Sequence, residues 1–179
     1  MVSRLIILAC LAPLALAAAP YRASVDTRAL VMVVRAADGE VVARYDGISI
    51  GRGGAAAVHY RRDGTTPLGD FRIVAVRRPH RYGAFYQFDY PTPAHAELAL
   101  AAGKLPRRSR DAIVRAAAAR RLAPQGTPLG GGIGIHGVGR GDPAIHAAFN
   151  WTTGCIALSD AQLQDFSRWA RIGMQVEVR

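Results

Sequence analysis

The sequence predicts an α+β fold that is mostly β, built on a largely antiparallel, sandwich-like sheet. Three observations lead to this fold class. Apolar, β-branched or alternating segments of the kind that form strands dominate both ends of the chain. Segments with helical start signals lie between them and near the C-terminus. With 179 residues and no internal repeat, the chain is long enough for one domain with a sizeable core.

The strand signals are clearest in two pairs of segments. Ala29–Ala36 is apolar and β-branched, and an Asp-Gly turn separates it from Val41–Tyr45, which together predict a β-hairpin. Phe71–Arg77 and Ala84–Asp89 alternate as half-buried strands do. The glycine-rich Gly51–Gly54 lacks the strand-then-helix setting of a phosphate-binding loop, so we interpret it as a turn.

Helix signals fill the middle of the sequence and return near its end. Thr92, with a proline after it, is a predicted start for a first helix, and Ser109 is a predicted N-cap for a second, alanine-rich one. Ser159 and Gln162 form a predicted capping box for the last helix, which Gly173 ends. The expected helices and the segments around them are Pro93–Leu100, Arg110–Leu122, a loop at Ala123–Gly132 and a closing strand at Met174–Val178.

The N-terminus has the features of a signal peptide. Arg4 supplies a short positive start, Leu5–Leu16 is an apolar run, and residues 15–17 (Ala-Leu-Ala) form a small-x-small cleavage site. The run is shorter than the roughly twenty residues that a spanning helix needs, so a retained membrane anchor is the less favoured alternative. We therefore divide the chain into a signal peptide (1–17), a short segment (18–28) and one domain (29–179). We expect an exported protein of the periplasm or cell envelope.

The net charge of +10 favours anionic partners: nucleic acid, a membrane surface or an acidic cell-wall polymer. The basic residues are scattered and are not interleaved with aromatic ones, which together with export argues against nucleic acid. We expect a monomer without a stable membrane anchor.

Removal of the signal peptide would take away Cys10 and leave Cys155 as the only cysteine. A free cysteine is most often a small buried hydrophobic residue. Here, however, it follows the polar stretch Thr-Thr-Gly and just precedes a helix start. A short apolar strand ends at His136, earlier in the chain. These are the parts that a cysteine acyl-transfer enzyme needs.

The chemistry of such a site follows from the residue types. A neighbouring imidazole can raise the thiolate fraction of a cysteine greatly. The N–H groups of Gly154 and Cys155 could serve as an oxyanion hole. The other ring nitrogen of His136 needs a partner, which the carbonyl group of Gly137 could supply; Asp142, the nearest acidic residue, is a less favoured substitute.

Four motifs resemble those of the L,D-transpeptidase catalytic domain (the YkuD-like family). "IHG", a gap and then "TTGCIAL" is similar to the active-site signature of that family. "DGTTPLGDFRI" (Asp63–Ile73) resembles its Thr-Pro-x-Gly-x-Phe segment, "FDYPTP" (Phe88–Pro93) its Tyr-Pro segment, and "GMQVEV" its terminal strand. The resemblance covers Ala29 to Val178, with the motifs in the family's order.

The resemblance implies a mixed β-sandwich with inserted helices and a site in a cleft, and it implies that Cys155 is the nucleophile and His136 its general base. The substrate would be the peptide stem of peptidoglycan, cleaved before its terminal D-alanine through a thioester. The acceptor would be an amine of another stem, a wall-attached protein or a free amino acid. With water as acceptor the enzyme would be an L,D-carboxypeptidase, and a catalytically dead peptidoglycan-binding module is a further alternative. The family needs no metal or cofactor.

Two positions depart from the family pattern. Thr153 stands where many members have histidine, and Ala157 stands where many have an arginine that helps to hold a substrate carboxylate. Arg140 or Arg81 could replace that arginine, and the sequence does not choose between them. The other candidates for substrate contact are Thr152, Thr153, His146 and Tyr82. We expect His59 and His80 at strand edges or in surface loops, and His95 on a helix surface. Tyr82 and Tyr86 could line the cleft, although aromatic residues in a strand are more often core residues.

Overall fold

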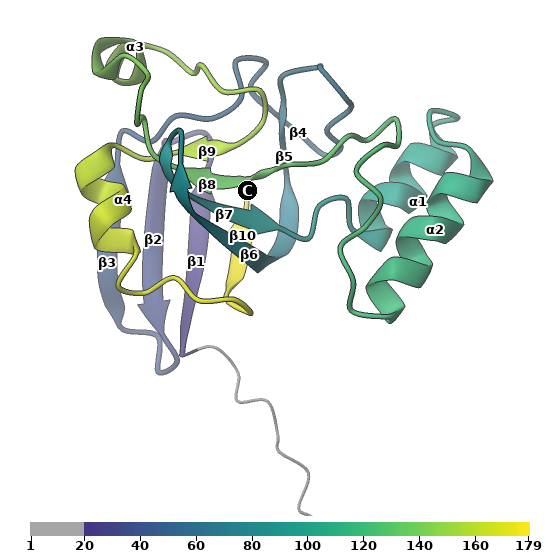
Figure 1. The fold of residues 1–179 in the computed structure, drawn as a ribbon, viewed down its shortest axis with the longest axis horizontal. Coiled ribbons are helices and arrows are strands. Elements are labelled where there is room, and N and C mark those ends of the chain that lie inside the picture. Colours follow the sequence, from purple (N-terminus) through teal and green to yellow (C-terminus); the bar gives the residue numbers. More distant parts are fainter. Residues whose placement is uncertain (1–19) are drawn as a thin grey trace, which may run out of the picture.

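The computed structural model describes residues 20–179, whose arrangement is shown in Figure 1. The signal-peptide features and Cys10 lie outside the described residues. No helix within residues 20–179 is long and apolar enough to cross a membrane. The elements in chain order are β1 (Tyr21–Asp26), β2 (Val31–Ala36), β3 (Val41–Asp46), β4 (Ala55–Ala56), β5 (Thr66–Pro67), β6 (Gly69–His80), β7 (Gly83–Phe88), α1 (Pro93–Ala101), α2 (Arg107–Ala118), β8 (Gly134–His136), α3 (Pro143–Ala148), β9 (Ile156–Ala157), α4 (Asp160–Phe166) and β10 (Gln175–Val178).

Eight strands form one sheet in the order β3-β2-β1-β10-β6-β7-β8-β9. β10 joins the two halves, because it pairs in parallel with β1 and antiparallel with β6. The sheet curls, so that β7 to β9 cross in front of β1 and β2 in Figure 1, and the chain after β3 reaches β9 through the bridge between Ser49 and Ala157. The predicted fold class is confirmed, and its layers are two halves of a single curled sheet.

Both predicted hairpins are present. β2 and β3 pair antiparallel, and Gly39 in their turn has a φ of 94°, a conformation that glycine adopts readily. β6 and β7 also pair antiparallel. β6 continues to His80, beyond the predicted end at Arg77, so this hairpin extends further from the sheet than expected.

The sheet contains a strand that the sequence analysis placed outside the domain. Residues 18–28 were predicted as a short segment before the domain, yet β1 lies within them. β1 pairs with β2 on one side and β10 on the other, and Ala23 and Val25 are buried in the core. The ordered part of the domain therefore begins well before residue 29, because β10 needs β1 as its parallel partner.

The helices differ from the prediction mainly at their ends. α1 has Thr92 as its N-cap, as predicted. α2 begins at Arg107 and not after Ser109, because the carbonyl group of Pro106 already accepts the N–H groups of Ser109 and Arg110. α4 has the predicted capping box but ends at Phe166, well before Gly173.

The core fills the space enclosed by the curled sheet and α4. Phe166 of α4 packs edge-on against Tyr45 and Tyr86, with ring centroids 6.2 and 5.2 Å apart. Tyr86 is fully buried, as predicted. This packing holds β7 in place, and β7 in turn carries β8 along its free edge.

The seating of β8 on β7 leaves no room for a side chain at Gly134. A Cβ there would lie 2.2 Å from the carbonyl oxygen of Tyr86, whereas a Cβ on Gly126 would meet nothing within 4 Å. We expect Gly134→Ala to lower the free energy of unfolding by about 3 kcal/mol or more, and Gly126→Ala to change it by less than about 1 kcal/mol. Urea denaturation of the two variants checks this. Equal small effects would show that β8 can move away from β7 at little cost.

Candidate active site

The cysteine and the histidine come together through one pair of strands. β8 and β9 pair in parallel, with His136 opposite Ala157. Cys155 immediately precedes β9, so it lies beside Gly134 and, because side chains alternate along a strand, on the same side as His136. Diagonal neighbours on paired strands are about 7–8 Å apart. The two side chains therefore lie on the same side of the sheet at its β9 edge.

The thiol of Cys155 is protonated in this arrangement. It is 9% exposed, and its S–H group donates to the carbonyl oxygen of Gly132 at 3.4 Å. Burial raises the pKa of the thiol to about 11, although the N–H group of Gly134 acts in the opposite direction. The expectation that the imidazole enriches the thiolate is therefore not met in this state.

His136 is held in the tautomer that a general base requires. Its Nδ1 lies 2.7 Å from the carbonyl oxygen of Gly137, as the sequence analysis anticipated. Because a carbonyl oxygen can only accept, Nδ1 carries the hydrogen and Nε2 is left with its lone pair. Burial lowers the pKa of His136 to about 4, so the ring is neutral at pH 7. Asp142 caps α3 through the N–H group of Ala144 and is not the partner of His136.

The hairpin of β6 and β7 fixes the segment that carries His136. The N–H group of Gly137 donates to the carbonyl oxygen of Tyr82 at 3.1 Å. A Cβ on Gly137 would lie 2.5 Å from Oδ1 of Asp160 and 3.0 Å from the Tyr82 carbonyl oxygen, so only glycine fits. The residue that orients the imidazole is thus clamped between the hairpin and the start of α4.

Aromatic rings surround the imidazole. Tyr82 stacks on His136 with ring centroids 4.5 Å apart, and Trp151 meets His136 edge-on at 5.6 Å. The indole N–H of Trp151 donates to Nδ1 of His146 at 3.3 Å, which anchors α3. Tyr82 thus lies beside the site, as expected. His146 is buried and bonded to Trp151, so it supports this wall, and Trp151 is a site residue that the sequence analysis missed.

Thr152 organises the loop before Cys155 through its hydroxyl group. Thr152 is 3% exposed, and its hydroxyl accepts the N–H of Gly154 at 3.1 Å and donates to the carbonyl oxygen of Cys155 at 2.7 Å. Thr152 was predicted to bind substrate and Gly154 to donate to an oxyanion; in this structure the Gly154 N–H donates to the Thr152 hydroxyl. The Cys155 N–H has no acceptor within residues 20–179, and Thr153 is exposed.

A second histidine supports this loop from behind. His59, which was expected at the surface, is 4% exposed. Its Nδ1 lies 2.7 Å from the carbonyl oxygen of Thr65 and 2.9 Å from Oδ1 of Asp63. A Cβ on Gly154 would come within 3.2 Å of that Nδ1 and 2.7 Å of the Thr65 oxygen. No local sequence signal indicated this contact, because it depends on how a distant loop folds back against Gly154.

The remaining histidines, His95 and His80, differ in their relation to the site. His95 is 3% exposed and not on a helix surface, and its two ring nitrogens lie 2.7 Å from the Thr92 hydroxyl and 2.9 Å from the Leu68 carbonyl oxygen. His80 lies half-buried at the tip of the hairpin, with its ring centroid 5.6 Å from that of Tyr82, and its charge contributes to the lowered pKa of His136. No three metal-binding side chains gather at any point in the described part of the chain.

The two candidate arginines differ in how they are connected to the imidazole. The guanidinium group of Arg81 lies over the Tyr82 ring, 4.4 Å from its centroid, and Tyr82 in turn stacks on His136. The positive charge of Arg81 also contributes to the lowered pKa of His136. Arg140 is exposed, and its backbone N–H donates to the Arg81 carbonyl oxygen at 3.2 Å. Of the two, Arg81 is tied directly to the site.

The sequence profile of the L,D-transpeptidase catalytic domain (YkuD) matches residues 20–178. The chain therefore belongs to this family, and the matched range includes β1. No curated protein sequence matches the chain significantly.

Solved structures share the fold at low sequence identity. Pgp2, the helical cell shape determining protein of Campylobacter jejuni, has 18% identity and a TM-score of 0.58, and the alignment covers 89% of this chain and 47% of Pgp2. An L,D-transpeptidase (residues 123–326) from Xylanimonas cellulosilytica has 18% identity and a TM-score of 0.51, and the alignment covers 94% of this chain and 64% of that protein. L,D-transpeptidase 3 from Mycobacterium tuberculosis, solved with a faropenem-derived adduct, has 14% identity and a TM-score of 0.51, and the alignment covers 89% of this chain and 60% of that protein. The chain thus spans between 47% and 64% of these proteins.

The lowered pKa of His136 makes stability depend on pH. In the unfolded state His136 has a pKa of 6.5 and binds a proton below that pH, whereas in the folded state it binds the proton only near pH 4. The stabilisation is therefore present above pH 6.5 and is lost as the pH falls. At about 1.4 kcal/mol per pKa unit, the wild type should lose about 3 kcal/mol more than His136→Gln between pH 7 and pH 4. Urea unfolding across this range measures the difference, and parallel curves would contradict the burial of a neutral ring.

Proposed function

We propose that the protein is an exported cysteine L,D-transpeptidase acting on peptidoglycan stem peptides. The observation that carries the proposal is the pairing of β8 with β9, which sets Cys155 beside a histidine whose free nitrogen is Nε2. A buried thiol and a buried neutral imidazole on one side of a sheet edge are the two groups that thioester chemistry requires. Membership of the family supplies the substrate class.

The reaction begins from a neutral pair. When the stem enters, Nε2 of His136 takes the thiol proton as Sγ attacks the carbonyl carbon of the diamino-acid residue. The Cys155 N–H then donates to the developing oxyanion. Collapse of the intermediate breaks the peptide bond, and the imidazolium gives its proton to the departing amine of D-alanine. An acceptor amine attacks the thioester, and its proton returns to the sulfur through His136.

Arg81 is the residue that we assign to the substrate carboxylate. The site lacks the arginine that many family members have after the cysteine, since Ala157 stands there and is fully buried. Arg81 presents a guanidinium group on the ring of Tyr82, which in turn stacks on the imidazole. A carboxylate bound there would place the end of the stem close to the reacting bond.

Replacement of the nucleophile tests the proposal directly. Cys155→Ser should abolish turnover, because a hydroxyl group is a far poorer nucleophile than a thiolate. The measurement is mass spectrometry of muropeptides incubated with wild type and variant, both shown to be folded by circular dichroism. Cross-linked or amine-exchanged stems from the wild type alone are the expected result. Trimmed stems would indicate an L,D-carboxypeptidase, and tight binding without any product would indicate a dead-site binding module.

His59 should position the oxyanion donor through its contact with Gly154. His59→Leu removes the hydrogen bonds of Nδ1, whereas His59→Asn retains a donor in nearly the same place. Acylation of Cys155 by a carbapenem needs the Cys155 N–H, but alkylation by iodoacetamide does not. We expect His59→Leu to slow acylation roughly tenfold or more relative to alkylation, and His59→Asn to restore the ratio.

Intact-protein mass spectrometry at one pH measures both reactions at the same sulfur. A parallel loss of both rates in His59→Leu would indicate collapse of the site and not displacement of one donor. No loss of either would reduce His59 to a core residue.

A further inference from the structure

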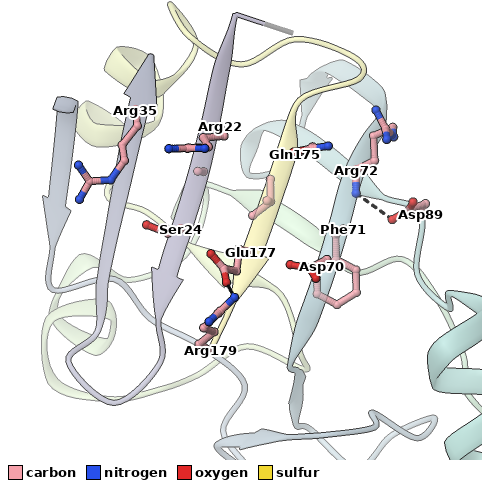
Figure 2. Close-up of a pocket in the computed structure, with 12 residues that line it drawn as sticks. Arg22, Ser24, Arg35, Asp70, Phe71, Arg72, Asp89, Gln175, Glu177 and Arg179 are labelled. Atoms are coloured by element: carbon pink, nitrogen blue, oxygen red, sulfur yellow. Dashed lines mark hydrogen bonds and ion pairs between the residues drawn. The ribbon is translucent and has the colours of Figure 1, made fainter. Parts of the chain in front are cut away.

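Three arginines form a row on the outer face of the sheet. Through the strand registers Arg35 lies opposite Arg22, Arg22 opposite Gln175, and Gln175 opposite Arg72. Figure 2 shows these four residues side by side across β2, β1, β10 and β6. Their neighbours along each strand, such as Ala23 and Val176, are buried in the core, so the four side chains point away from it.

This arginine row is oriented but not neutralised. Within residues 20–179 none of its three guanidinium groups has a carboxylate in ion-pair contact. Arg35 donates to the carbonyl oxygen of Gly39 at 3.3 Å, and Arg72 donates to that of Gly173 at 3.2 Å. Arg22 directly faces Arg35, an arrangement that destabilises a sheet unless an anion lies between the charges. The row is thus prepared to receive oxyanions.

The next row of the same face supplies negative charge. It runs from Ser24 through Glu177 to Asp70. Glu177 is paired with Arg179, whereas no cation in the described residues contacts Asp70. Figure 2 shows this row alongside the arginines, and together the two rows line a depression of about 720 Å³. The depression also includes Asp89, whose carboxylate accepts the backbone N–H of Arg72. The face therefore offers several guanidinium groups and, in Asp70, a carboxylate without an ion-pair partner among the described residues.

We propose that this depression binds a second peptidoglycan stem peptide, away from the cysteine. A stem peptide carries several carboxylates and, on its diamino acid, one free amine, which matches the arginine row with Asp70 beside it. The row spans about 14 Å, the length of about four extended residues. In the sheet order, β6, β7 and β8 lie between β10 and β9. A stem bound at the arginine row would therefore leave Cys155 accessible to another stem. The inference rests on the proposed function, because that function names the polymer.

The test compares two triple variants with the same change in charge. Arg22→Gln, Arg35→Gln and Arg72→Gln removes the row, and Arg107→Gln, Arg108→Gln and Arg115→Gln removes three exposed arginines of α2. Each triple variant also carries Cys155→Ser, and thermal melts check that it is folded. Binding is measured by sedimentation with purified sacculi that have been stripped of phosphate polymers. We expect about tenfold weaker binding for the row variant and little change for the α2 variant. Equal losses, no loss, or no binding of wild type to stripped sacculi would overturn the proposal.

Two further arms identify the ligand and separate this inference from the catalytic one. Acetylation of the amines of the sacculi should weaken the binding of the parent protein but not that of Asp70→Asn; equal sensitivity would rule out the amine contact. Turnover of a soluble stem by a row variant that retains Cys155 should match wild type. Sacculus binding that depends on the row, in a protein without turnover, would reject the proposed catalysis and leave the binding surface standing.

Discussion

The parallel pairing of β8 with β9 is the contact on which the candidate site depends. Each strand is short, and the loop, α3 and the cysteine segment separate them along the chain. Glycine makes the pairing possible, because Gly134 seats β8 directly on the backbone of β7. The register then fixes which residues face the same space, and His136 and Cys155 do so only in this register. A slip of one residue would turn one of them to the opposite side.

Burial gives this pair a particular electrostatic character. The same desolvation that lowers the pKa of His136 raises the pKa of Cys155, so both groups are neutral at pH 7. A thiolate–imidazolium pair would have to form against this cost, and it gains the necessary stabilisation only when the substrate carbonyl group accepts the negative charge. In the proposed reaction, nucleophilicity is thereby coupled to the presence of substrate, and the protonated, buried thiol is less open to oxidation than a thiolate.

The sequence predicted those parts of the protein that local patterns determine. The hairpins, the capping box at Ser159 and the Gly137 carbonyl as partner of His136 each follow from adjacent residues. The errors concern tertiary contacts. β1 becomes a strand because β10 lies beside it, and His59 is buried because its loop folds against Gly154. Burial also decided the protonation of the thiol, and no spacing in the sequence reports the depth of a side chain.

The two faces of β1, β10 and β6 differ in the side chains that they carry. Their inner side chains, among them Val25, Val176 and Phe71, are apolar and fill the core. The outer side chains face solvent, so any polar residue would be accepted there. Arg22 and Arg35 nevertheless lie opposite each other, where a neutral pair would be more stable. Packing does not require charge on this face, although the hydrogen bond from Arg35 to the carbonyl oxygen of Gly39 offsets part of the repulsion. A ligand that bridges the two guanidinium groups is the physical factor that can offset the remainder.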